Sequence, residues 1–193
     1  MSTTEEFFKS NSDISLGDMI VLRNGSKSAS VTHGGQPLRL KLGSAEMPLY
    51  APFGFSSFDG QEHDRESLAL QSQDADTTAV VECLDQIVLK KLKANLSKYT
   101  TAKEAQVDEY WRELVKTSDK YPPIIRTKCT KSKVRVWGPN KEVLSVNDVQ
   151  PRSEMAVVVH VRNVYFQNKG MGLCLEVSDI LLLNGNSQNC PWE

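Results

Sequence analysis

Residues 154–183, EMAVVVHVRNVYFQNKGMGLCLEVSDILLL, decide the fold. The run from Glu154 to Phe166 predicts one long strand, because strict alternation places Val157, Val159, Val161, Asn163 and Tyr165 on one face. The intervening positions hold further apolar residues, which indicates burial on both faces for part of the strand. Gln167–Gly170 predicts a hairpin turn, and Met171–Leu183 predicts one or two return strands. Tyr165 and Phe166 precede this turn, so one of them can lie in the core while the other is exposed.

The segment before this hairpin predicts two helices and then more strands. Residues 77–96 repeat apolar side chains at helical spacing, with Leu84 and Ile87 as expected core positions. Residues 102–116 predict a second, shorter helix. Residues 124–130 and 133–137 predict the two strands of a hairpin, and residues 142–146 continue the meander.

The N-terminal part is predicted to be β-rich with a long loop. Residues 19–22 and 29–32 read as a strand pair, and residues 38–42 alternate leucine with cations. Residues 47–58 contain two prolines and a glycine, which argues against a helix or a central strand. Residues 59–76 are rich in acids and predict a polar loop.

The order of strands, helical segment and strands predicts a mainly β fold with a helical insertion. An OB-like antiparallel barrel fits this order, although periodicity does not separate it from other small barrels or a small sandwich. We expect a flexible N-terminal arm over 1–17, one barrel domain over 18–183 with the insertion at about 77–118, and a polar C-terminal tail over 184–193.

Composition and motifs exclude several classes of function. The 193 residues are 39% hydrophobic and 24% charged with a net charge of -1, which is typical of a globular domain rather than a histone-like basic protein. No apolar run is long enough to span a membrane, and the N-terminus lacks a secretory signal pattern. The three histidines and four cysteines lack metal-ligand spacing, and no catalytic or nucleotide-binding motif occurs. We therefore expect no enzyme, cofactor, metal or disulfide, and an intracellular, reducing compartment: cytoplasm, nucleus or a viral replication site.

Charge is unevenly distributed along the chain. Residues 121–136 contain five cations and no acid, and the predicted hairpin would gather them on one face with Trp137 beside them. Cations that follow phosphates and aromatics that stack bases are typical of single-strand binding. A sheet with one solvated face also carries outward lysines, so this alternative stays open. The candidate nucleic-acid-binding residues are Arg39, Lys41, Tyr50, Phe58, Arg126, Lys128, Lys131, Lys133, Arg135 and Trp137.

Four segments together resemble a known family. These are Ala51–Ser56 with its Pro-Phe-Gly-Phe stretch, the basic strand Ile124–Lys128, the long strand Val157–Phe166, and the Gly-led return Lys169–Val177. The pattern is similar to the single-stranded DNA-binding proteins of tailed phages and large eukaryotic DNA viruses, which use one OB-fold barrel. The resemblance implies a non-catalytic protein of replication or recombination that coats single strands, contacts replication proteins and forms a homodimer. Phage members carry an acidic tail that ends in an aromatic, whereas residues 184–191 here contain no acid.

Two functions therefore follow from the sequence. The first is sequence-nonspecific binding of a single-stranded nucleic acid, DNA by resemblance, although the residues alone do not separate DNA from RNA. The second is a structural or assembly subunit, of a virion or a multiprotein complex, that acts only through protein contacts.

Overall fold

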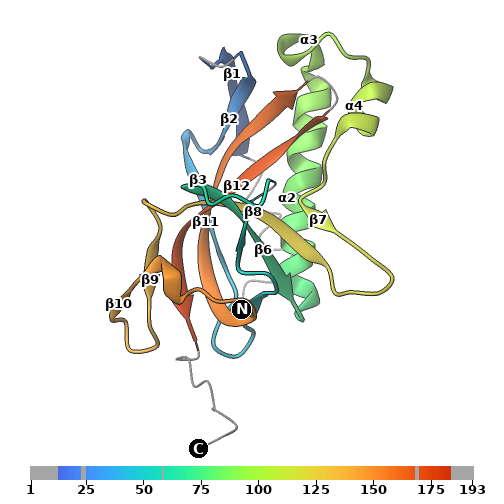
Figure 1. Ribbon diagram of the computed structural model, residues 1–193. Coiled ribbons are helices and arrows are strands. Elements are labelled where there is room, and N and C mark those ends of the chain that lie inside the picture. Colours follow the sequence, from blue (N-terminus) through green and yellow to red (C-terminus); the bar gives the residue numbers. More distant parts are fainter. Residues whose placement is uncertain (1–12, 23–24, 58, 168–169, 184–193) are drawn as a thin grey trace, which may run out of the picture.

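The computed structural model describes residues 13–22, 25–57, 59–167 and 170–183. A mixed β-sheet of twelve strands carries one helical segment on the side of the sheet (Figure 1). The strands are β1 (Ile14–Val21), β2 (Lys27–His33), β3 (Gln36–Leu42), β4 (Leu49–Ala51), β5 (Phe55–Ser56), β6 (Arg65–Ser72), β7 (Val115–Lys116), β8 (Ile124–Thr130), β9 (Arg135–Trp137), β10 (Val143–Leu144), β11 (Ser153–Gln167) and β12 (Gly170–Leu182). The helices are α2 (Ala75–Ala94), α3 (Leu96–Tyr99), α4 (Glu104–Tyr110) and the 3-10 turn η2 (Val146–Asp148). Within the described ranges, no helix is long and apolar enough to cross a membrane.

The long β11–β12 hairpin is the centre of the sheet. Its pairing runs from Met155 opposite Leu182 to Gln167 opposite Gly170, which confirms the predicted hairpin, although residues 168 and 169 of its turn lie outside the described part. The other edge of β11 pairs with β4, β3 and β2, one after another along its length. The other edge of β12 pairs with β8 and then β9.

The sheet closes on itself through these pairings. The ring runs from β11 to β4, β6, β8 and β12, and β12 pairs again with β11. Inside the ring lie side chains such as Leu68, Ile125 and Val159, all fully buried. The predicted mainly β, OB-like fold with a helical insertion is therefore confirmed. Two pairings, β12 with β8 and with β9, are parallel, so the sheet is mixed rather than purely antiparallel.

Two β-bulges change which residues share a face of the central hairpin. The register shifts between Val161 and Asn163 on β11, and between Val158 and Val159 opposite Ser178 on β12. A bulge inserts one residue and reverses the alternation that follows it. Tyr165 therefore does not share the inner face of Val161, as strict alternation predicts, but lies on the outer face.

The helical insertion packs against β1, β6 and β7. Helix α2 begins at the N-cap Asp74, whose carboxylate accepts hydrogen bonds from the amides of Asp76 and Thr77, and Leu84 and Val88 are fully buried on its inner side. The buried Asp85 on this side accepts hydrogen bonds from Trp111 Nε1 at 3.2 Å and from the Leu114 amide at 3.1 Å. The α2 helix thereby holds residues 111–114 beside the sheet.

Several predicted boundaries are wrong. The second helix ends at Tyr110 rather than near residue 116, because Val115 and Lys116 pair with β8 as strand β7. Residues 65–72 are not part of a loop but form β6, whose alternating buried residues, Glu66, Leu68, Leu70 and Ser72, face inward. Strand β4 lies between β11 and β6 although residues 47–58 carry prolines, because the three-residue strand ends before Pro52.

The predicted domain limits fall partly outside the described residues. β1 starts at Ile14, so the last residues of the expected 1–17 arm belong to the sheet. The rest of that arm, residues 1–12, and the expected tail at 184–193 lie outside the described part.

The predicted hairpin of residues 124–130 and 133–137 does not form. β8 and β9 both run parallel to β12 and lie end to end along its edge. Between them, the amides of Lys133 and Val134 donate to the carbonyl of Thr130, a turn after which the chain continues in the same direction. The basic residues of this segment are therefore spread along an edge instead of gathered on one hairpin face.

Candidate functional site

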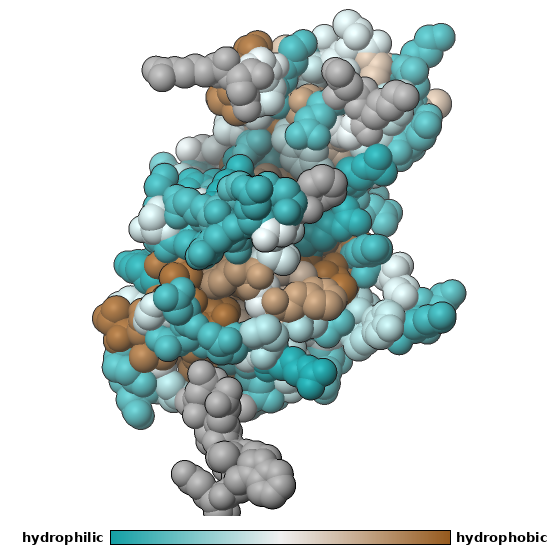
Figure 2. All heavy atoms as spheres, viewed as in Figure 1, coloured by the Kyte–Doolittle hydropathy of each residue, from teal (hydrophilic) through white to brown (hydrophobic). Residues whose placement is uncertain are grey.

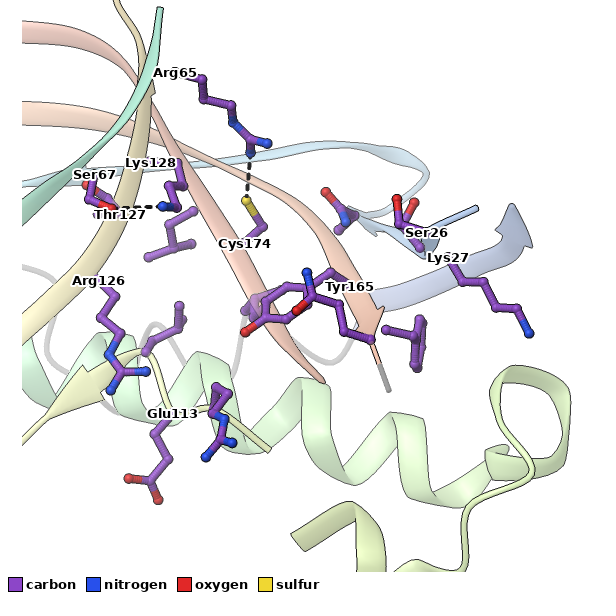
Figure 3. A pocket seen from close by; sticks show the side chains of 18 of the residues that line it. Ser26, Lys27, Arg65, Ser67, Glu113, Arg126, Thr127, Lys128, Tyr165 and Cys174 are labelled. Atoms are coloured by element: carbon purple, nitrogen blue, oxygen red, sulfur yellow. Dashed lines mark hydrogen bonds between the residues drawn. The ribbon is translucent and has the colours of Figure 1, made fainter. Parts of the chain in front are cut away.

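A groove of about 740 Å³ crosses the outer face of the sheet, and we call it the central groove. Figure 3 shows Arg65, Arg126 and Lys128 on β6 and β8 at one side and Lys27 at the other, with Tyr165 and Cys174 between them. Residues 112–114 line a further part of the groove. The groove is therefore assembled from segments spread over the whole chain.

Positive charge predominates in the central groove. Its cations are Lys27, Arg65, Arg112, Arg126 and Lys128, and its one acid is Glu113. Within the described part of the chain, Lys27, Arg65, Arg126 and Lys128 form no salt bridge. Arg65 Nη2 instead lies 3.4 Å from Cys174 Sγ, and Lys128 Nζ donates to Ser67 Oγ at 2.8 Å. These cations keep their charge available for an anion.

The strand register explains why these cations share a face. Lys128 pairs with Ser67 and Arg126 pairs with Ala69 across β6 and β8, and Lys128 also lies opposite Glu176 of β12. Residues directly opposite each other on paired strands point to the same side of the sheet. The alternate positions of β8, Ile125 and Thr127, point inward and are buried.

Tyr165 supplies the aromatic surface of the central groove. It is half-buried, and burial raises the pKa of its hydroxyl, so the ring is neutral at physiological pH. Its neighbour Phe166 turns inward and stacks on Tyr99, with ring centroids 6.2 Å apart and planes 4° from parallel. Phe166 is thus in the core, as expected for one of these two aromatics, whereas Tyr165 is half-buried rather than exposed and lines the groove.

A second basic groove, of about 550 Å³, lies further along the same hairpin, and we call it the distal groove. Arg39, Lys41, Arg135 and Lys141 line it together with Trp137. Its floor is apolar and consists of Ala156, Val158 and Leu181. The acid of this groove, Asp179, pairs with Arg135 Nη2 at 2.7 Å.

The structure divides the predicted binding residues between these places. Arg126 and Lys128 lie in the central groove, whereas Arg39, Lys41, Arg135 and Trp137 come together in the distal groove. The remaining predicted residues lie elsewhere or outside the described part: Lys131, Lys133, Tyr50 and Phe58.

Each of these four residues has its own environment. Lys131 Nζ lies 2.8 Å from Glu62 and 3.2 Å from Glu66, and its side chain is mostly buried, so this lysine is neutralised within the fold. Lys133 is exposed on the turn after β8, and Tyr50 lies half-buried on β4 opposite Glu154. Phe58 is not among the described residues.

Sequence reasoning missed Lys27, Arg65, Arg112, Tyr165 and Lys141 as groove residues. The predicted loop over residues 59–76 includes Arg65, although the alternation of residues 65–72 is a readable strand signal. The outward orientation of Tyr165 depends on the bulge near Arg162, and the sequence pattern does not indicate this bulge. Lys27 and Arg112 come from distant segments, and local patterns do not show what they face.

Thiols and imidazoles do not form a cluster in the described part of the chain. Cys83, Cys129 and Cys174 are free, and Cys190 lies outside the described residues. Burial raises the pKa of Cys83 to about 11 and that of Cys129 to about 12, so neither is a reactive thiolate. No group of three or more metal-binding side chains occurs among the described residues. The predicted absence of a metal site and of an enzymatic centre stays a prediction.

Comparison with known proteins gives a match at the level of fold. No protein-family model matches this sequence, and no curated protein is significantly similar to it. The single-stranded DNA-binding protein of bacteriophage Enc34 has a similar structure, with a TM-score of 0.51 and 12% identity over 90% of this chain and 95% of that one. Gp2.5, a single-stranded DNA-binding protein encoded by bacteriophage T7, has a TM-score of 0.53 and 10% identity over 79% of this chain and 92% of that one. The resemblance to phage proteins of this kind is therefore confirmed for the fold.

Proposed function

We propose that this protein binds single-stranded DNA without sequence selectivity, that the central groove is its binding site, and that it is not an enzyme. The observation that carries the proposal is the set of five cations around Tyr165, with one acid among them. Cations in a groove follow a phosphate backbone whatever the sequence, and an aromatic ring stacks on any base.

The geometry favours a single strand over a duplex. Tyr165 lies between the strands that carry the cations, so a base must turn toward the sheet to stack on it (Figure 3). In a duplex the base faces are already stacked inside the helix and only the base edges are accessible in the grooves. A single strand presents both its phosphates and its base faces to such a surface.

The solved structures of similar fold support the choice of DNA. The Enc34 and T7 proteins are both named as single-stranded DNA-binding proteins. On this basis we propose a role in replication or recombination inside the cell, while replication proteins as partners and a homodimer as oligomeric state stay predictions of the sequence resemblance.

A binding titration tests this proposal. The probes are labelled 20-nucleotide oligo-dT, oligo-rU and a 20-base-pair DNA duplex, at two salt concentrations. We expect the Arg126→Ala/Lys128→Ala variant to bind oligo-dT about tenfold more weakly at 0.15 M salt, because two lost phosphate contacts lower the salt slope by about 1.4. The control Lys90→Ala/Lys120→Ala removes two exposed lysines outside both grooves and should bind normally.

Three results would contradict the proposal. Normal oligo-dT affinity in the folded Arg126→Ala/Lys128→Ala variant would show that the central groove is not the site. Absence of affinity in the unmodified protein at low salt would instead favour the assembly function, in which the sheet contacts only other proteins. Tighter binding of oligo-rU than of oligo-dT would replace DNA with RNA as the ligand.

A further inference from the structure

We propose that the distal groove continues the central groove, so that one single strand runs along the outer face of β11 and β12 and contacts both. This inference rests on the proposed function and extends it from one groove to a defined path. It assigns Arg39, Lys41 and Trp137 to the far end of that path.

Both grooves lie on one face of the same hairpin. At the central groove Asn163 pairs with Cys174, and at the distal groove Val158 pairs with Asp179. Each strand has one bulge between the two grooves. Val158 and Asn163 are five residues apart on β11, so strict alternation would place them on opposite faces. The bulge places both on the outer face, and the bulge on β12 does the same for Cys174 and Asp179. β11 and β12 are each one continuous strand through both regions, Ser153–Gln167 and Gly170–Leu182.

The length of the path follows from the strand. From Cys174 to Leu181 the chain advances seven residues, which is about 23 Å of extended strand. At ~3.4 Å per nucleotide, the spacing in a stacked strand, this distance matches about seven nucleotides. Shorter oligonucleotides would therefore reach only one groove.

The residues between the grooves do not form a negative barrier. Glu176 is the acid at the midpoint, and its carboxylate accepts hydrogen bonds from Arg162 Nε and Thr130 Oγ1, each at 2.8 Å. At the distal end Arg135 neutralises Asp179. A phosphate backbone can therefore pass both acids without an unpaired negative charge beside it.

The distal groove offers the same two kinds of contact as the central one. Arg39 lies opposite His160, Lys41 lies opposite Val158, and neither cation has a salt bridge within the described part of the chain. Trp137 lies opposite Leu181, so its ring borders the apolar floor. Cations beside an aromatic and an apolar floor suit phosphates and bases together. An acidic peptide has similar chemistry, but continuity with the central groove favours the strand.

The test compares oligo-dT of 5 and 20 nucleotides on three variants with unchanged thermal stability. Arg126→Ala/Lys128→Ala should weaken binding of both lengths. Arg39→Ala/Lys41→Ala should weaken binding of the 20-mer about tenfold at 0.15 M salt and lower its salt slope by about 1.4, while binding of the 5-mer changes little. Lys90→Ala/Lys120→Ala is again the charge-matched control.

The outcomes separate this inference from the proposed function. If Arg39→Ala/Lys41→Ala binds the 20-mer normally while Arg126→Ala/Lys128→Ala does not, the continuous path is wrong and the central site stands. If Arg39→Ala/Lys41→Ala weakens both lengths equally, the distal groove is not an extension and the inference also fails. Binding of an oligo-glutamate peptide that is lost in Arg39→Ala/Lys41→Ala, with unchanged 20-mer affinity, would assign the distal groove to a protein partner. Failure of the unmodified protein to bind either length would refute the proposed function itself.

Discussion

At the scale of single residues, Asp85 is the most unusual titratable group. It is 2% exposed, its Oδ2 accepts both hydrogen bonds from Trp111 and Leu114, and its Oδ1 has no partner within the described residues. Burial raises the pKa of its carboxyl to about 6. The buried charge of Asp85 lowers the stability of the fold. Its two hydrogen bonds at the same time hold residues 111–114 in place, and this segment carries Arg112 and Glu113 of the central groove.

Asp85→Asn should remove a pH dependence of folding. Above pH 6 the folded protein holds a buried carboxylate that the unfolded chain would solvate, which costs about 3 kcal/mol for a pKa raised by about two units. As the pH falls from about 6 toward 4, the folded state takes up the proton first, so this cost disappears. The free energy of unfolding of Asp85→Asn, measured with urea, should therefore exceed that of the unmodified protein at pH 7.5 and approach it at pH 4.5.

Asp85→Ala provides the comparison for this prediction. It also removes the buried charge, but it leaves the indole and amide donors of Trp111 and Leu114 without an acceptor, so it should be less stable than Asp85→Asn by about 1–3 kcal/mol at pH 7.5. A difference between Asp85→Asn and the unmodified protein that does not change with pH would contradict the raised pKa.

Tyr165→Ala should weaken oligo-dT binding by about 1–3 kcal/mol and leave the salt slope unchanged, because stacking releases no counterions. Tyr165→Phe keeps the ring and should bind nearly as the unmodified protein does. Fluorescence titration at two salt concentrations measures both quantities. A changed slope in Tyr165→Ala, or equal loss in Tyr165→Phe, would exclude stacking as the role of this ring.

Single residues also show where sequence reasoning reached its limit. The cations of Arg126 and Lys128 could be placed on one outward face because regular alternation holds through β8. The outward orientation of Tyr165 could not be predicted. It depends on one extra residue in the bulge of β11, and many sequences can form such a bulge. The local sequence of Lys131 is consistent with phosphate binding. In the fold, Glu66 of β6 and Glu62 of the preceding loop form salt bridges with it, and no local pattern shows these partners.

At the scale of elements, helix α2 was predictable because its apolar spacing, its N-cap and its last-turn lysines agree. The strand partners of β8 and β9 were not predictable. Both strands depend on β12, more than forty residues later in the chain, and the local sequence with its turn residues fits a hairpin equally well. The local sequence thus indicates which segments are strands, but the choice of partner is a long-range property.

Two substitutions in α2 test how the helix packs. Leu84 is fully buried, so Leu84→Ala should lower the free energy of unfolding by roughly 2–5 kcal/mol. Ile87 is only half-buried, so Ile87→Ala should cost clearly less. Urea denaturation of both variants measures the difference. Equal costs would show that the helix is rotated about its axis, so that Ile87 is as deeply buried as Leu84.

At the scale of the whole molecule, the helices and both halves of the sheet share one hydrophobic core. The sheet closes through β11 and β12, which pair with strands from the N-terminal, middle and C-terminal parts of the chain. The order of elements was enough to predict a mainly β fold with a helical insertion, but closure of the sheet could not be separated from a small sandwich, because it depends on long-range strand pairing. Figure 2 shows that hydrophilic residues predominate on one face, while apolar residues gather in its middle and lower part.

This shared core predicts one cooperative unfolding transition. Far-ultraviolet circular dichroism follows the helices and sheet, and tryptophan fluorescence of a Trp192→Phe variant follows Trp111 beside α2 and Trp137 at the distal groove. The two signals should give the same urea midpoint, because neither region can lose its packing alone. Separate midpoints would show that the helical insertion unfolds independently of the sheet.

The late position of β12 in the chain has a consequence for synthesis on the ribosome. Until residues 170–182 have left the exit tunnel, β8 and β9 lack one edge partner and β11 lacks its hairpin mate. A nascent chain of about 165 residues would therefore expose unpaired strand edges, which favour aggregation. Contacts this distant in sequence also slow folding, because the loop between them must close first. Arrested nascent chains that end before residue 170 should accordingly be protease-sensitive, and resistance should arise only once β12 has emerged.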